Sequence, residues 1–225
     1  MTIHFIREIE NLKKMILALS ALVEETVQKA VQALEETDSA LAQQIIENDS
    51  LIDQREVEVE ETCLKILALH QPVAIDLRYV IAVLKINNDL ERVGDLAVNI
   101  AERAIVLSSQ KNKIKKINFS NMMNTVVKML RESLDSLINL DPILARKVCA
   151  LDDEIDAEHE QKYEMIQEQI MENPDQTVSL IQYLSVSRYL ERIADQTTNI
   201  AEDVIYMVEG EIARHDKNKL RMDNE

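Results

Sequence analysis

Apolar residues recur along most of the chain with the spacing of an α-helix. Between residues 89 and 105, for example, they stand at Leu90, Val93, Ala97, Ile100 and Ala104. Intervals of three and four place these side chains on one helical face, while polar and acidic residues occupy the other. Interruptions of this pattern predict six long helices, at residues 3–36, 39–70, 74–109, 118–139, 142–172 and 175–212.

The junctions between the predicted helices carry residues that start or stop helices. Asp38 and Asp141 each stand just before a predicted helix, the second followed by Pro142, and we expect each aspartate to cap that helix. Pro72 and Pro174 stand at the next junction of each half, where a proline breaks a helix. Because these connections are short, consecutive helices should run antiparallel.

The second half of the chain repeats the first. Residues 89–105 (DLERVGDLAVNIAERAI) align without gaps with residues 189–205 (YLERIADQTTNIAEDVI), and a weaker match joins 41–53 to 144–156. We therefore predict an all-α fold of two tandem three-helix bundles followed by a tail, at residues 1–110, 117–213 and 214–225.

Composition supports helices over sheets. The chain has only two Gly and three Pro in 225 residues, too few for the frequent turns of a sheet protein. It has no Trp and two Phe, so the core must be aliphatic. Cys63 and Cys149 stand singly inside helical patterns, where small apolar core residues are expected rather than a disulfide or a metal site.

The net charge of −16 is shared by both halves and excludes a broad basic face. Direct binding of nucleic acid is therefore not expected, whereas metal cations or basic surfaces of partner proteins suit this field. No apolar run approaches the roughly 18 residues that span a bilayer, and the first residues do not resemble a signal peptide. We expect a cytoplasmic protein without a transmembrane segment.

Four acidic residues of the first half are predicted to meet at one height. Asp53 and Glu91 each lie 19 residues from Pro72, on opposite sides of it, and Asp49 and Asp95 each lie 23 residues from it. With a rise of about 1.5 Å per residue, the two pairs reach the same level on adjacent antiparallel helices. The spacing of four within each pair places its carboxylates on one helical face.

The second half repeats this arrangement around Pro174, so each half should hold four facing carboxylates. Such groups repel one another strongly, and a bound hard cation would offset the repulsion. Mg²⁺, Mn²⁺, Ca²⁺ and iron all accept oxygen ligands, and Arg92 and Arg192 could supply part of the counter-charge. The plain alternative is an acidic, solvated helix face that binds nothing. The candidate metal ligands are Asp49, Asp53, Glu91, Asp95, Asp152, Asp156, Glu191 and Asp195.

Other chemistry finds little support in the sequence. The Glu-x-x-His pairs of di-iron bundles are absent, as is a Gly-rich phosphate loop. His159 follows Asp156 by three residues, but Glu56 stands at the matching position of the first half. A metalloenzyme that uses the carboxylates for hydrolysis or redox chemistry would lack a nucleophile and a histidine base. A structural helical adaptor without metal stays open as an alternative.

The repeated pattern Leu-Glu-Arg-Val/Ile-x-Asp…Asn-Ile-Ala-Glu resembles the PhoU family of phosphate-signalling regulators. Supporting matches are Asp76-Leu77-Arg78 and the ending at residues 210–215, and the resemblance covers nearly the whole chain. Asp-Leu-Arg has no equivalent in the second half, where Thr177 and Val178 stand. Any role of Arg78 should therefore be confined to the first half.

The resemblance implies two three-helix bundles, a cytoplasmic location and no catalytic activity. It implies a negative regulator of phosphate uptake and phosphate-starvation signalling, acting as an adaptor between the ATPase of a phosphate ABC importer and a phosphate-sensing histidine kinase. Some members bind metal through Glu/Asp-x-x-x-Asp pairs, which here fall on the eight acidic residues named above. Amphipathic bundles often dimerise, so both a homodimer and a monomer stay open.

Overall fold

The fold is all-helical, as predicted. The computed structural model describes residues 3–110 and 117–210, so the expected tail at 214–225 lies outside the described residues. The described ranges contain six long α-helices and one short 3₁₀-helix, and each predicted boundary lies within three residues of the observed one. The elements are α1 (Ile3–Glu36), α2 (Ser39–His70), α3 (Ala74–Ser108), α4 (Ser120–Asn139), α5 (Pro142–Glu172), η1 (Pro174–Gln176) and α6 (Thr177–Glu209).

The predicted helix boundaries have the expected local chemistry. The side chains of Asp38 and Asp141 each accept two hydrogen bonds, of 2.9 to 3.1 Å, from backbone N–H groups of the helix that follows. After α2, Gln71 adopts a left-handed conformation with φ 46° just before Pro72, and Pro174 opens η1. Both aspartates are therefore N-caps, and both prolines mark hairpin turns.

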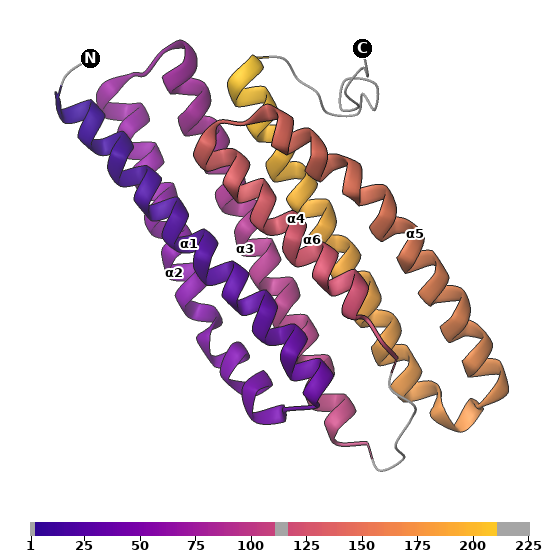
Figure 1. The fold of residues 1–225 in the computed structure, drawn as a ribbon. Helices are drawn as coiled ribbons and strands as arrows, with labels where there is room; N and C mark the ends of the chain where they lie inside the picture. Colours follow the sequence, from indigo (N-terminus) through magenta and orange to yellow (C-terminus); the bar gives the residue numbers. More distant parts are fainter. Residues whose placement is uncertain (1–2, 111–116, 211–225) are drawn as a thin grey trace, which may run out of the picture.

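Each half forms an up-down-up bundle, and the two bundles lie side by side (Figure 1). α3 and α6 pack along each other and join the halves, whereas α1 and α4 touch more sparsely. In the described residues, α2 and α5 contact only helices of their own half. The α2–α3 and α5–α6 turns lie at opposite ends of the molecule.

The core is aliphatic and continues through both halves. The predicted stripe of α3, from Leu90 to Ala104, is fully buried. Cys63 is buried and Cys149 is half-buried, and both are free thiols whose pKa is raised to about 12, first of all by burial. Both cysteines are therefore packing residues, as expected, and are poor nucleophiles at neutral pH. No described helix is long and apolar enough to cross a membrane.

Candidate functional site

The first acidic cluster, defined as Asp49, Asp53, Glu91 and Asp95, lies on the seam between α2 and α3. Asp49 and Glu91 are half-buried, while Asp53 and Asp95 are exposed. Burial, followed by the charge of Asp53, raises the pKa of both Asp49 and Asp95. Burial, followed by the charge of Asp95, raises the pKa of Glu91. The two pairs therefore interact across the seam, as their distances from Pro72 predict.

The second acidic cluster, defined as Asp152, Asp156, Glu191 and Asp195, repeats this arrangement between α5 and α6. The pKa of Asp152 rises to about 6 through burial and then through the charges of Asp156 and Asp195. The pKa of Asp195 also rises to about 6, through burial and then through the charges of Glu191 and Asp156. Burial, with repulsion between the carboxylates added to it, therefore lets Asp152 and Asp195 hold protons at mildly acidic pH.

Apolar packing beneath each cluster fixes its register. Ile52, next to Asp53, is buried against Gly94, which lies between the two acids of α3. In the second half the buried residues Ile155 and Ala194 stand at the matching positions. The core residues alternate with the acids along each helix. Burial of the core residues therefore turns the carboxylates of the two facing helices toward the same open seam.

Arginine supplies little counter-charge at either cluster. Arg92 lies 3.7 Å from Asp89 rather than against a cluster carboxylate, and it lowers the pKa of Glu91 less than the acids raise it. The charge of Arg192 lowers the pKa of Asp195 only as the smallest of four causes. In the part of the chain that the structure describes, no ion pair involves any of the eight carboxylates.

Several buried oxygen atoms beside the clusters lack hydrogen-bond partners among the described residues. They are Oδ1 of Asn87, one turn before Glu91, and at the second cluster Oδ1 of Asp152 and Oγ1 of Thr198. The Thr198 hydroxyl is close enough to lower the pKa of Asp152, although no hydrogen bond of standard geometry joins them. Buried polar atoms without partners are uncommon in proteins, and a bound ion or water is one explanation for them.

Two contacts next to the clusters were not predicted from the sequence. Asn87 Nδ2 donates to the Glu56 side chain at 2.8 Å and to the Glu56 carbonyl at 2.9 Å. In the second half, His159 Nδ1 lies 2.8 Å from Ser187 Oγ. The charge of Glu56 raises the pKa of Glu91, which makes Glu56 a fifth acid of the first cluster. Extending the repeat by one helical turn aligns Glu56 with His159 and Asn87 with Ser187, but the contact within each half depends on how its two helices pack.

The donor set fits a hard cation, but the side chains do not form a finished coordination shell. Each cluster offers four carboxylates from two antiparallel helices, and oxygen donors of this kind suit Mg²⁺, Mn²⁺, Ca²⁺ and iron. However, no group of three or more His, Cys, Asp or Glu side chains in residues 3–110 and 117–210 is arranged so that it could hold a metal ion. A cation would therefore have to draw the carboxylates together through changes of rotamer.

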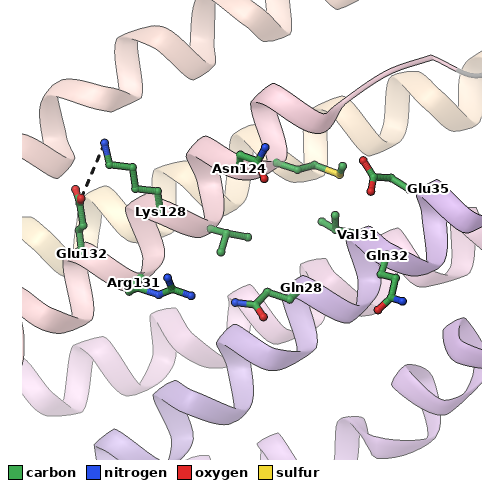
Figure 2. A pocket seen from close by; sticks show the side chains of 10 residues that line it. Gln28, Val31, Gln32, Glu35, Asn124, Lys128, Arg131 and Glu132 are labelled. Atoms are coloured by element: carbon green, nitrogen blue, oxygen red, sulfur yellow. Dashed lines mark ion pairs between the residues drawn. The ribbon is translucent and has the colours of Figure 1, made fainter.

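A groove of about 550 Å³ separates α1 from α4 (Figure 2). Val31 and Val127 contribute apolar surface to it, and three of its charged side chains, those of Lys128, Arg131 and Glu132, form ion pairs. Arg131 Nε donates to Glu24 Oε1 at 2.9 Å, and Lys128 lies 3.9 Å from Glu132. The groove depends on how the two halves meet, so periodicity within one helix gives no sign of it. Its paired charges make it a poor site for a free ion.

Known proteins share this fold along nearly the whole chain. The family model described as PhoU domain matches residues 16–104 and 119–204. The chain is 38% identical to a phosphate-specific transport system accessory protein PhoU homolog of Aquifex aeolicus, over 93% of this chain and 95% of that protein. A homolog with the same description from Pseudomonas aeruginosa is 39% identical, over 94% and 88% of the two chains.

Solved structures agree with these relatives. The crystal structure of PhoU from Pseudomonas aeruginosa superposes with a TM-score of 0.89 at 38% identity, covering 92% of this chain and all of that one. The phosphate transport system regulatory protein PhoU from Streptococcus pneumoniae superposes with a TM-score of 0.83 at 32% identity, covering 92% and 98% of the two chains.

Proposed function

The chain belongs to the PhoU family, whose members are regulatory accessory proteins of phosphate transport and not enzymes, and we propose that it represses phosphate uptake and phosphate-starvation signalling when phosphate is ample. The observation that carries this proposal is the doubled PhoU domain, which occupies both bundles at residues 16–104 and 119–204. The regulator acts in the cytoplasm as an adaptor between the ATPase of a phosphate ABC importer and a phosphate-sensing histidine kinase.

Charge supports a role in protein binding. The net charge of −16 favours binding to basic patches on partner proteins, and salt should weaken this binding. A helical adaptor relays a signal only if it binds two states of a partner with different affinity. Repression therefore requires that a partner, either the importer or the kinase, binds this chain more tightly in its phosphate-replete state than in its phosphate-starved state.

Both acidic clusters bind divalent or iron-type cations in this proposal. Three observations support it: the facing carboxylates, the raised pKa values of Asp152 and Asp195, and the buried oxygen atoms without partners beside the clusters. Each cation would be held by oxygen donors from α2 and α3 or from α5 and α6, and would tie the two helices of one seam together. The chemistry that it supplies is charge neutralisation and cross-linking.

A metal-free adaptor is the second candidate, and the arrangement of the side chains favours it. In the described residues no three potential ligands are placed to hold an ion, so the acids could serve as solvated surface alone. Elemental analysis of protein purified without chelator or affinity metal separates the two candidates, because only the first predicts metal that is lost when the cluster acids are neutralised.

Deletion of the gene tests the regulatory proposal itself. A deletion strain without a second copy should keep its phosphate-starvation genes switched on despite ample phosphate, and the intact gene should restore repression. Normal repression in the deletion strain would overturn the proposal. Complementation with a gene carrying Glu191→Gln and Asp195→Asn then asks whether the second cluster is needed for repression.

A further inference from the structure

The walls of the groove between α1 and α4 are tied together at two points. At one end Arg131 Nε donates to Glu24 Oε1 at 2.9 Å, and at the other Ser120 Oγ donates to Glu35 Oε1 at 2.8 Å. On each helix the two contact residues are eleven positions apart, which corresponds to about 16 Å along the helix axis. The groove therefore runs between two antiparallel walls of matched length, about three helical turns each.

Two hollows lie along this groove. The larger, of about 550 Å³, has Val31 in one wall and Val127 in the other, and both side chains are half-buried against the core (Figure 2). The smaller, of about 260 Å³, shares Glu35 and Met123 with the larger. An elongated ligand could therefore occupy both. The apolar lining of the smaller hollow consists of Leu34, Ile117, Phe119, Met123 and Tyr183.

The packing of the two halves leaves this space open. α1 packs on α3 and α4 packs on α6, while the contact between α3 and α6 joins the halves (Figure 1). α1 and α4 touch only sparsely, so their facing side chains fill the seam incompletely. Because the side chains of one helix pack into the grooves of its neighbours, a further helix laid along this seam would contact both walls.

The charge of the walls indicates which kind of helix fits. α1 carries six acidic residues against four Lys and Arg, and α4 carries two of each kind. By contrast, α2 carries seven acidic and two basic residues, and α5 carries nine and three. A strongly basic surface is therefore attracted to α2 and α5, whereas the nearly neutral groove suits an apolar stripe with few charges beside it. The exposed amides of the groove are those of Gln28, Gln32 and Asn124.

We propose that this groove is the docking site for an amphipathic α-helix of a partner protein. The helix lies along α1 and α4 for about three turns and places apolar side chains in the two hollows, at positions i and i+4 or i+7. Because each half supplies one wall, the docked helix bridges the two bundles. This inference rests on the proposed adaptor role, and it names the surface through which the importer ATPase or the kinase is bound.

Site-specific photo-crosslinking locates the bound helix. The photoreactive residue p-benzoylphenylalanine replaces Asn124, which is exposed at the groove, and in control proteins it replaces the exposed Gln43 of α2 or Gln167 of α5. The probes are the purified ATPase of the phosphate importer and the full-length kinase in detergent, each tested alone. We expect the Asn124 replacement to crosslink to one partner segment with apolar residues three and four positions apart, and the controls to give little product.

Filling the groove from exposed positions tests its contribution to affinity. Gln32→Trp/Asn124→Trp places two large rings at the hollows, and Gln43→Trp/Gln167→Trp places the same rings on the outer helices as a matched control. We expect the groove variant to raise the dissociation constant of the partner about tenfold or more, and the control to change it less than about twofold. Val127→Glu should act like the groove variant, and circular dichroism checks that each protein is folded.

The outcomes separate this inference from the proposal beneath it. If neither the ATPase nor the kinase binds wild type, the adaptor role fails and the inference fails with it. If a partner binds but crosslinks only to the control positions, and its affinity does not respond to the groove variants, the adaptor role stands and docking in the groove is overturned. Crosslinking of Asn124 replacements to a second copy of this chain, or to a partner segment without helical spacing, would also overturn it.

Discussion

A Cβ atom at Gly94 would lie 2.9 Å from Cδ1 of Ile52 and 3.2 Å from its Cγ2. The two residues stand directly beneath the first acidic cluster, Gly94 between Glu91 and Asp95 on α3 and Ile52 beside Asp53 on α2. Their close approach therefore helps to set the distance between the facing carboxylates. In the second half, Ala194 stands at the matching position, so the seams need not have the same width.

Gly94→Ala tests whether this close approach constrains the seam. Alanine should gain up to about 1 kcal/mol in helix propensity, but overpacking of a buried seam costs about 1–3 kcal/mol. Cδ1 of Ile52 can turn away about χ2, whereas Cγ2 is held in place because χ1 of a β-branched residue is stiff. We expect a net loss in the free energy of unfolding, with a larger loss for Gly94→Val. Urea denaturation measures both. A Gly94→Ala protein more stable than wild type would show that the seam has room to spare.

The raised pKa values of the second cluster predict an unusual pH dependence. Asp152 and Asp195 have a pKa of about 6 when folded, above the ordinary value of 3.8, so the folded state binds more protons between these pH values. In metal-free protein, lowering the pH from 7 toward 4 should therefore increase the contribution of these two groups to stability, and Asp152→Asn/Asp195→Asn should remove that gain.

Urea denaturation at several pH values in the presence of chelator measures this effect. Asp175→Asn is the control, because it removes one exposed acid of η1 without touching a cluster. The relevant quantity is the difference between wild type and the cluster variant at each pH. A difference that stays constant from pH 7 to pH 4 would mean that the two carboxylates are fully solvated and do not interact.

Bound metal and the neutralisation of cluster acids should both stabilise the protein, because each relieves repulsion among the carboxylates. Added Mn²⁺ raises the melting temperature by mass action if it binds only the folded state. Glu91→Gln/Asp95→Asn should raise the metal-free melting temperature, because repulsion at the first cluster is relieved, and should reduce the response to Mn²⁺. A wild type that is as stable without metal as this variant would contradict the predicted repulsion.

The two aspartate caps should contribute similar amounts to stability. Asp38 and Asp141 each accept two backbone hydrogen bonds at the start of α2 and α5. Replacement of either by alanine should cost about 1 kcal/mol in the free energy of unfolding, and asparagine should restore most of it. Thermal and urea denaturation check this. A loss for only one of them would show that the repeats are capped differently.

Local patterns predicted the helices well because the signals that start and stop a helix are local. Asp38, Asp141, Pro72 and Pro174 act on their own turn of the chain, so their effects can be read from neighbouring residues. The two acidic clusters could be placed because distance along a helix is proportional to residue number, and the two prolines give a common origin.

Features that depend on packing between helices could not be predicted. Asn87 is fully buried although its side chain is polar, because its amide reaches Glu56 on the facing helix. The groove between α1 and α4 depends on how α3 packs on α6, which no periodicity within one helix specifies. The orientation of each carboxylate depends on rotamers that the spacing of four leaves free.

The most direct test of the central claim is the metal content of protein purified without chelator or affinity metal, measured by inductively coupled plasma mass spectrometry. Wild type should carry metal, each double variant (Glu91→Gln/Asp95→Asn or Glu191→Gln/Asp195→Asn) should lose the metal of its own cluster and keep the other, and the variant with all four changes should carry almost none. A wild type free of metal, or a fourfold variant with as much metal as wild type, would contradict the claim that these acidic clusters bind cations.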